Sequence, residues 1–300
     1  IPALFKKFGI DFIKKIKGMF SICIIDKAKQ ETYLIRDRFG IKPLYYYLDR
    51  GKKLLIFASE IQALFENKIN KLENYSETLR FFQYSLTGSS DETWFKNIYQ
   101  IKPGQYLKYS RNKFYTNEYY KLEDYVFEND KKSTKYFELE NNIFELIEKS
   151  LKQHSISDQT LGLHISGGSD SSLIASACKK IGLDTECFTF DFEESEFSEV
   201  KNAKKISDIL KFKHSTAKIN NANLVNEFEK NVNIQYEPFT SLRVLCQNNL
   251  YETYKNSCKV ILDGCGGDEI GAGYKYQQLA WTMDMIGDGY EKIVKKMQKK

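Results

Sequence analysis

The 300-residue sequence contains no apolar run long enough to cross a membrane. A membrane-spanning helix needs about 18–20 apolar residues, and the longest run here, at residues 20–25, has the length of a buried strand. Four prolines and seventeen glycines are too few for a collagen-like or low-complexity chain. The six cysteines form no C-x-x-C pair and no zinc-type cluster with the three histidines. These absences exclude membrane-spanning, fibrous and zinc-finger proteins, and they favour free thiols in the reducing cytoplasm.

Arginine is also scarce: only six of the 45 basic residues are arginines. The lysines are interspersed with acidic residues, and the net charge is only +5. Proteins that read nucleic-acid sequence cluster positive charge and use arginine for base contacts, so we expect no nucleic-acid partner. What the sequence does contain is 42% hydrophobic and 14% aromatic residues, enough to build ordinary cores. At about 100–200 residues per domain the length predicts two domains, with a boundary in the charged, weakly patterned stretch 121–135.

The first part of the chain has a β-rich pattern. Apolar residues in the stretch 4–16 repeat at helical spacing, with lysines on the opposite side, and predict one amphipathic surface helix. Residues 20–25 and 31–35 predict a β-hairpin, and residues 54–57 a further strand. Pro103 and Gly104 predict a tight turn.

Beyond residue 135, strand and helix patterns alternate. Strands are predicted at residues 161–166, 185–191, 213–219 and 259–263, and helices at 137–154, 171–180, 195–210, 222–234 and 242–256. This alternation predicts an α/β domain, with a doubly wound parallel sheet, helices on both faces, and a ligand crevice at the carboxyl ends of the strands. Two glycine-rich segments, 166–172 and 263–269, follow such strands.

The first glycine-rich segment reads SGGSDSS and leads into a predicted helix. Glycines let a phosphate approach the backbone, and the start of a helix offers unpaired N–H groups to an anion. A Walker P-loop would need a lysine after the glycines, and none is present. A nucleophile elbow would need glycine at Ser171. A helix that begins after a glycine turn without binding any ligand remains an alternative, as does a serine hydrolase with Ser169 as nucleophile.

The second segment reads DGCGGDE and also ends in acidic residues. Because both segments follow strands of one sheet, Asp170 of the first and Asp268 of the second are predicted to face each other across the crevice. Two carboxylates suit a shared Mg²⁺ bound to a polyphosphate. Without a metal their charges would repel each other.

These motifs resemble those of the glutamine-dependent asparagine synthetase family. Residues 166–172 are similar to the pyrophosphate loop of the N-type ATP pyrophosphatases, and residues 263–274 to a later element of the same domain. Segments 18–20, 36–46, 58–60 and 103–104 resemble the second half of the family's class II glutaminase. The resemblance implies the C-terminal part of an Ntn-type α+β glutaminase at residues 1–125. It also implies a PP-loop synthetase domain at residues 135–300, which in the family continues past Lys300.

The resemblance implies an ATP-dependent amidotransferase that forms AMP and pyrophosphate. In the family glutamine is hydrolysed in one domain, ATP adenylates a carboxylate in the other, and ammonia displaces AMP to give an amide. Synthesis of asparagine from aspartate through an aspartyl-adenylate is the leading expectation. The implied ligands are therefore ATP, Mg²⁺, glutamine and a small carboxylate, with no nucleic acid and no membrane as partner. The assembly is left open, a homodimer being one option.

Positions matching the family's motifs imply an ATP site, a metal site and a substrate side. The implied ATP-binding residues are Ile165, Ser166, Gly167, Gly168, Asp170, Ser171, Ser172, Phe190, Asp263 and Gly264. Asp170 and Asp268 would bind Mg²⁺. Glu237 falls near the family's amino-acid substrate segment.

Three departures from the family pattern bear on function. Cys265 stands where well-known synthetases have a glutamate suggested to assist ammonia attack, and Asp263 stands where serine is common. Both leave the acceptor open, so a sugar acid or a peptide carboxylate is an alternative to aspartate, and a non-catalytic nucleotide-binding relative is another. The N-terminal cysteine nucleophile of class II glutaminases is not in this sequence, so the fragment by itself is expected to lack glutaminase activity.

Overall fold

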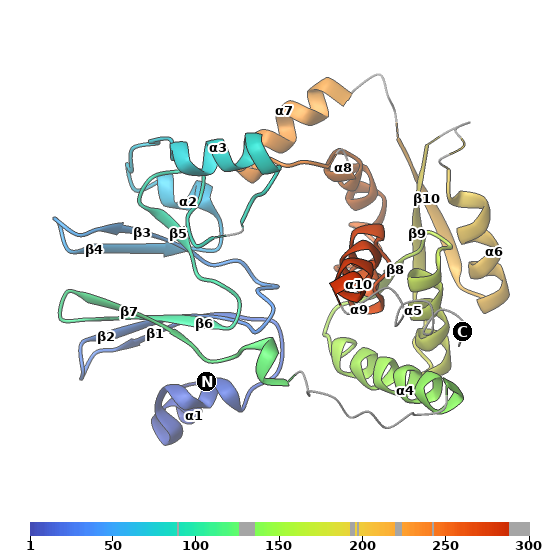
Figure 1. Ribbon diagram of the computed structural model, residues 1–300, viewed down its shortest axis with the longest axis horizontal. Helices are drawn as coiled ribbons and strands as arrows, with labels where there is room; N and C mark the ends of the chain where they lie inside the picture. The colour runs from blue at the N-terminus through green and yellow to red at the C-terminus, as the bar shows by residue number, and fades with distance from the viewer. Residues whose placement is uncertain are drawn as a thin grey trace. The chain divides into compact units, whose positions relative to one another are not determined.

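The computed structural model describes residues 1–88, 90–125, 136–192, 196, 198–219, 224–241 and 243–287. The chain divides into two compact units (Figure 1). The first unit comprises Ile1–Ser133 together with Asn223–Leu245, and the second comprises Thr134–Ala222 together with Cys246–Lys300. Within the described residues, no helix combines the length and the apolar character that a membrane crossing requires.

Two antiparallel sheets form the body of the first unit. One has the strand order β1-β2-β6-β7 and the other β4-β3-β5. Their bounds are β1 Ser21–Asp26, β2 Glu31–Arg36, β3 Tyr45–Asp49, β4 Leu54–Ala58, β5 Ile98–Gln100, β6 Gln105–Ser110 and β7 Lys113–Glu118. The predicted hairpin is confirmed as β1 and β2. Leu34 of β2, Leu48 of β3 and Leu107 of β6 share one buried core, so the two sheets pack against each other.

The first unit also contains short helices. They are α1 Pro2–Phe8, the 3₁₀ helix η1 Gly9–Lys14, α2 Ile61–Phe65, α3 Tyr75–Tyr84, the 3₁₀ helix η2 Leu122–Tyr125 and α7 Leu224–Gln235. The prediction of one continuous helix over residues 4–16 is wrong, because Gly9 has a φ of 59° and the α-helix ends there. The tighter 3₁₀ helix that follows buries Phe12 and Ile13.

The second unit is built on a parallel sheet, as the alternating pattern predicts. The strands β8 Leu161–His164, β9 Glu186–Asp191, β10 Lys213–Lys218 and β11 Val260–Leu262 lie in the order β10-β9-β8-β11. All three neighbouring pairs are parallel. The described helices are α4 Tyr136–His154, α5 Ser169–Lys180, α6 Val200–Leu210, α8 Arg243–Tyr254, α9 Gly267–Gly271 and α10 Lys275–Gly287.

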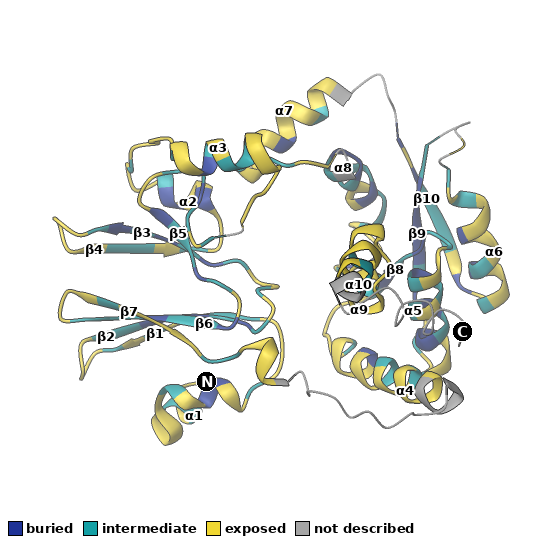
Figure 2. Cartoon of the chain, viewed as in Figure 1, coloured by how far each residue is buried: buried dark blue, intermediate teal, exposed yellow. Residues whose placement is uncertain are grey.

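Helices cover both faces of this sheet, and the alternation of side chains along β9 shows it. Cys187 belongs to a core that includes α4, α5 and α6, whereas the next residue, Phe188, belongs to a second core that includes α8. Most of β9 is buried on both faces (Figure 2), as expected for a central parallel strand. The helices predicted at 195–210 and 222–234 correspond to α6 and α7, which begin at Val200 and Leu224. Residues 195, 222 and 223 lie outside the described part.

Candidate nucleotide-binding site

Two glycine-rich loops leave the parallel sheet from adjacent strands. From β8 the sheet extends to β9 and β10 on one side and to β11 on the other. The order of the strands therefore reverses between β8 and β11. In open α/β sheets, ligands bind outside the carboxyl ends of the strands at such a reversal. Residues 165–168 follow β8 and residues 263–266 follow β11, so both loops stand at this position.

Serine side chains shape the first loop. Ser166 Oγ accepts the Gly168 N–H at 3.2 Å and lies 3.0 Å from Ser171 Oγ. Ser171 Oγ accepts the Ser166 N–H at 3.2 Å. These bonds tie the loop to the first turn of α5, whose N-cap residue Gly168 provides no side-chain cap. The hydroxyl of Ser172 is buried and has no hydrogen-bond partner within the part of the chain that the structure describes.

Gly167 brings this loop against helix α6. Its φ is 81°, a conformation that side chains other than glycine rarely adopt. A methyl group at this position would lie 2.6 Å from Asn202 Cβ and 2.8 Å from the Ala203 nitrogen. Both distances are far below van der Waals contact, so α6 and the loop pack this closely only because residue 167 has no side chain.

The second glycine-rich segment, 263–269, touches the first, 166–172. A methyl group on Gly264 would lie 3.0 Å from the Ser171 nitrogen, and one on Gly267 would collide with the carboxylate of Asp170. Gly267 is not among the predicted site residues, yet it makes this close approach. The available signal is its place in a second glycine pair, next to Asp268, which matches the pair Gly167 and Gly168.

The acidic residues of the second loop differ in their surroundings. Asp263 Oδ1 accepts the Cys265 N–H at 2.8 Å, and the thiol of Cys265 lies 3.2 Å from Asp263 Oδ2. The carboxylate of Asp268 lies against Gly273. The side chains of Cys265 and Asp268 are both exposed. They are therefore accessible to a ligand that enters from solvent.

Asp170 and Asp268 are the carboxylates that could hold a divalent cation. Asp170 Oδ1 accepts a hydrogen bond from Ser169 Oγ at 3.2 Å, and its other oxygen lies beside Gly267, the residue before Asp268. Within the described ranges no cluster of three or more Asp, Glu, His or Cys side chains could hold a metal ion. At nucleotide sites Mg²⁺ takes one or two carboxylates and completes its shell with phosphate oxygens and water. The donor set therefore fits a cation shared with a bound polyphosphate rather than a closed protein site.

Phe190 and Glu237 occupy different environments. Phe190, on β9, is 5% exposed and packs edge-on against His164, with ring centroids 5.0 Å apart. Its side chain is packed in the core and is not available to a ligand. Glu237 clusters with the first unit, where it accepts hydrogen bonds from the Tyr45 phenol and the Trp94 backbone N–H.

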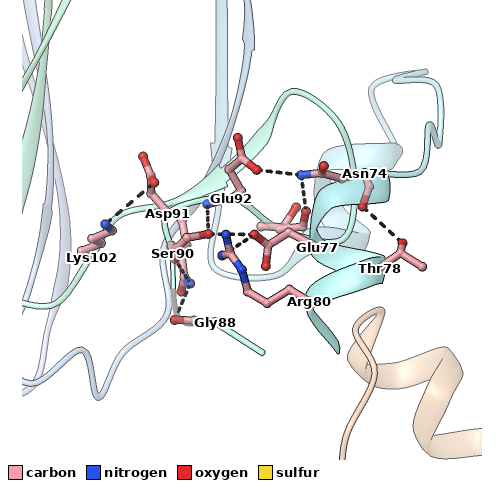
Figure 3. A network of polar contacts seen from close by, with 11 residues as sticks. Asn74, Glu77, Thr78, Arg80, Gly88, Ser90, Asp91, Glu92 and Lys102 are labelled. Carbon is pink, nitrogen blue, oxygen red and sulfur yellow. Dashed lines mark hydrogen bonds and ion pairs between the residues drawn. The ribbon is translucent and has the colours of Figure 1, made fainter. Parts of the chain in front are cut away.

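Glu237 is an ionisable group in a poorly solvated place. Burial raises the pKa of Glu237, and the negative charge of Glu77 adds to the increase. The two hydrogen bonds that Glu237 accepts lower its pKa but do not cancel this effect. Burial is also the main cause that raises the pKa of Tyr45 to about 12, and the neighbouring carboxylate adds to it. Glu77, on α3, is 4% exposed and accepts hydrogen bonds from Arg80 at 2.7 Å and Ser90 Oγ at 3.0 Å (Figure 3). Nothing in the sequence pattern of α3 marks Glu77 as buried.

The charged pair Arg36 and Asp37 holds the main chain of the first unit. Asp37 is 1% exposed. Its carboxylate accepts four backbone N–H groups at 2.9–3.3 Å, those of Phe20, Phe39, Ile41 and Lys42. The Arg36 guanidinium donates to three carbonyls at 2.8–3.1 Å, those of Gly40, Lys42 and Ile101. Charge-assisted bonds of this kind are strong, so the motif at residues 36–46 has an architectural role.

Two protein-family models match the chain. The glutamine amidotransferase domain matches residues 1–120, and asparagine synthase matches residues 142–296. The chain belongs to the asparagine synthase family. The resemblance drawn from the two glycine-rich motifs is thereby confirmed, as is membership of a ligase family.

The individual relatives of this chain are named either as asparagine synthetases or as amidases. It is 30% identical over 95% of its length to a protein assigned as glutamine-hydrolysing asparagine synthetase 2 in Methanocaldococcus jannaschii. It is 30% identical over 91% of its length to the glutamine-hydrolysing asparagine synthetase 2 of Bacillus subtilis. It is also 26% identical over 91% of its length to the amidase chry2 of Gibberella zeae. The chain spans 55%, 38% and 42% of these relatives, about half of their length.

Proposed function

We propose that the second unit binds ATP and activates a carboxylate by adenylation. The observation that carries this proposal is the contact of two glycine-rich loops at the reversal of strand order, where Gly267 lies against the carboxylate of Asp170. One loop presents an uncapped helix N-terminus, which suits a phosphate. The other brings a second acidic residue to the same place.

Each part of the site has a chemical task in this reaction. A carboxylate oxygen of the acceptor attacks the α-phosphorus of ATP, the bond to the β-phosphate oxygen breaks, and pyrophosphate leaves. The departing pyrophosphate would be held by hydrogen bonds from the first turn of α5 and from the Ser166 hydroxyl. The hydroxyl of Ser172, which has no partner within the described residues, would add another. Asp170 and Asp268 would hold Mg²⁺, which supplies positive charge to the phosphates. Ammonia then attacks the acyl carbon, AMP leaves, and an amide forms.

For the whole protein we propose synthesis of asparagine from aspartate, with ammonia derived from glutamine. Support comes from the match of residues 1–120 to a glutamine amidotransferase domain and from the names of the two relatives at 30% identity. The six cysteines all lie in the described part of the chain and form no disulfide there, which suits the reducing cytoplasm as the compartment.

The intact protein tests this proposal directly. With glutamine, aspartate and Mg-ATP, it should release AMP, pyrophosphate and asparagine in equal amounts. Asp170→Asn should abolish AMP release and leave glutamine hydrolysis measurable, because the change removes a phosphate-side carboxylate only. Absence of both AMP and asparagine with wild-type protein would refute the aspartate proposal, and unchanged synthesis by Asp170→Asn would refute the metal assignment.

A second candidate keeps the adenylation and changes the acceptor to a sugar acid or a peptide carboxylate. The observation that favours it is Cys265, which replaces the glutamate of well-known synthetases in the second loop. Its thiol is exposed and lies 3.2 Å from Asp263 Oδ2. The amidase name of one relative agrees with a varied acceptor. A panel of carboxylic acids, scored by pyrophosphate release, separates the candidates, since only the true acceptor raises release above the background without acceptor.

A further inference from the structure

A buried threonine contacts the start of the first glycine-rich loop, where the chain leaves β8. Thr189, on β9, is fully buried, and its hydroxyl donates to the carbonyl oxygen of Ile165 at 2.5 Å. Ile165 is the residue between strand β8 and Ser166. Its own N–H donates to the Phe188 carbonyl at 2.9 Å. The end of β8 is therefore held to β9 by a side chain as well as by the main chain.

The bond from Thr189 fixes the orientation of one particular peptide group. The Ile165 carbonyl and the Ser166 N–H belong to the same planar peptide unit. The carbonyl points to Thr189 Oγ1, and the N–H donates to Ser171 Oγ at 3.2 Å. With both ends of this peptide engaged, its plane cannot rotate without breaking a hydrogen bond. The direction of the chain as it enters Gly167 is thereby set.

His214 completes the arrangement from the neighbouring strand. His214 Nε2, on β10, lies 2.9 Å from Thr189 Oγ1. A hydroxyl has one proton, and Thr189 gives it to Ile165, so His214 must donate its Nε2–H to the threonine oxygen. Burial is the main cause that lowers the pKa of His214, so the ring is neutral at pH 7.5 with its single proton on Nε2. The two hydrogen bonds therefore run in one direction, from His214 on β10 to Thr189 on β9 and from Thr189 to the carbonyl of Ile165, which follows β8.

We infer that Thr189 and His214 are positioning residues for nucleotide binding, acting through the peptide between Ile165 and Ser166. This inference rests on the proposed function, since the loop they orient is the proposed phosphate site. Neither side chain needs to touch the nucleotide. Their effect is to hold the main chain of the loop, and with it the first turn of α5, in one conformation before ATP arrives, which lowers the cost of binding.

Thr189→Val and Thr189→Ser in the intact protein test the inference. Valine keeps the shape and removes the hydroxyl, so the Kd for Mg-ATP and its KM should rise about tenfold, the equivalent of about one lost hydrogen bond. Serine keeps the hydroxyl and should restore both constants to within about twofold. The matched control is Thr185→Val, because Thr185 is also buried but its hydroxyl has no partner within the described residues. This control should leave the Kd for Mg-ATP unchanged.

His214 provides a second and independent arm. His214→Leu should raise the Kd for Mg-ATP about threefold, while His214→Gln, which keeps an N–H near the Nε2 position, should stay close to wild type. Since His214 acts through Thr189, adding His214→Leu to Thr189→Val should cause no further loss. This arm decides the question if Thr189→Val does not fold.

The outcomes separate the two proposals. If wild-type protein binds no Mg-ATP, both the proposed function and this inference fail. If it binds Mg-ATP and Thr189→Val binds as well as Thr185→Val does, only the inference is overturned. The inference is overturned equally if Thr189→Ser is as weak as Thr189→Val, because the hydroxyl would then not matter.

Discussion

Gly267 lies directly against the carboxylate of Asp170, although 97 positions separate them in the chain. A methyl group on Gly267 would collide with that carboxylate. The contact joins the start of α9, which follows the loop after β11, to the start of α5, which follows the loop after β8, and it places the residue before Asp268 beside Asp170. The candidate site therefore depends on a residue that carries no functional group of its own.

Gly267→Ala should displace the Asp170 carboxylate and reduce pyrophosphate release about 100-fold, because misplacement of a reacting group by about 1 Å has an effect of that size. The control is Gly271→Ala in the same helix α9, where a methyl group would meet nothing within 4 Å. Steady-state rates of pyrophosphate release measure both variants. Equal rates for the two would show that the contact has no functional role.

Gly167→Ala should destabilise the protein by more than backbone strain alone. The positive φ of 81° costs a non-glycine residue about 1–3 kcal/mol, and the collision with Asn202 of α6 adds to this. Gly182→Ala is the matched control, since its φ is 79° and its methyl group would meet nothing within 4 Å. Urea unfolding measures both losses of stability. A loss no greater for Gly167→Ala than for Gly182→Ala would contradict the close packing of loop and helix.

Asp37→Ala should destabilise the first unit by about 3 kcal/mol or more, because it leaves backbone N–H groups without their charged acceptor. Asp26→Ala is the comparison, since Asp26 accepts two backbone N–H groups in an exposed turn, where water can replace it. The midpoint of thermal unfolding measures each effect. Similar shifts for the two variants would argue against an architectural role for Asp37.

Glu237→Gln should change how stability depends on pH. The pKa of Glu237 is raised above the ordinary value of 4.5, so the folded state binds this proton more tightly than the unfolded state does. Wild-type stability should therefore fall as the pH rises from 4.5 through the raised pKa. Glutamine cannot ionise but keeps an acceptor for Tyr45, so the variant's advantage in thermal midpoint should grow from pH 4.5 to pH 8.

Glu229→Gln supplies the control for this pH experiment, because Glu229 is exposed on α7. Its midpoint relative to wild type should stay constant over the same pH range. If the difference in thermal midpoint between Glu237→Gln and wild type does not vary with pH, the pKa of Glu237 is not raised in the folded protein.

Local patterns in the amino-acid sequence were enough to predict many of the elements and both motifs. Apolar alternation, helical spacing and glycine positions are properties of short segments, and they located β1, β2, β8, β9, β10 and β11 and both glycine-rich loops. The motif residues from Ser166 to Ser172 and from Asp263 to Asp268 identified the family, because phosphate binding requires particular residues at particular spacings within one short segment.

Contacts between distant segments arise only in the folded chain. These contacts include the approach of Gly267 to Asp170, the packing of α6 on Gly167, and the hydrogen bonds that Thr189 makes with Ile165 and His214. The charge of buried Glu77 likewise acts on Glu237, a residue 160 positions later in the chain. No local pattern records these contacts. They result from how strands order themselves in a sheet and how helices pack over it, since close packing in the folded chain fixes which side chains meet.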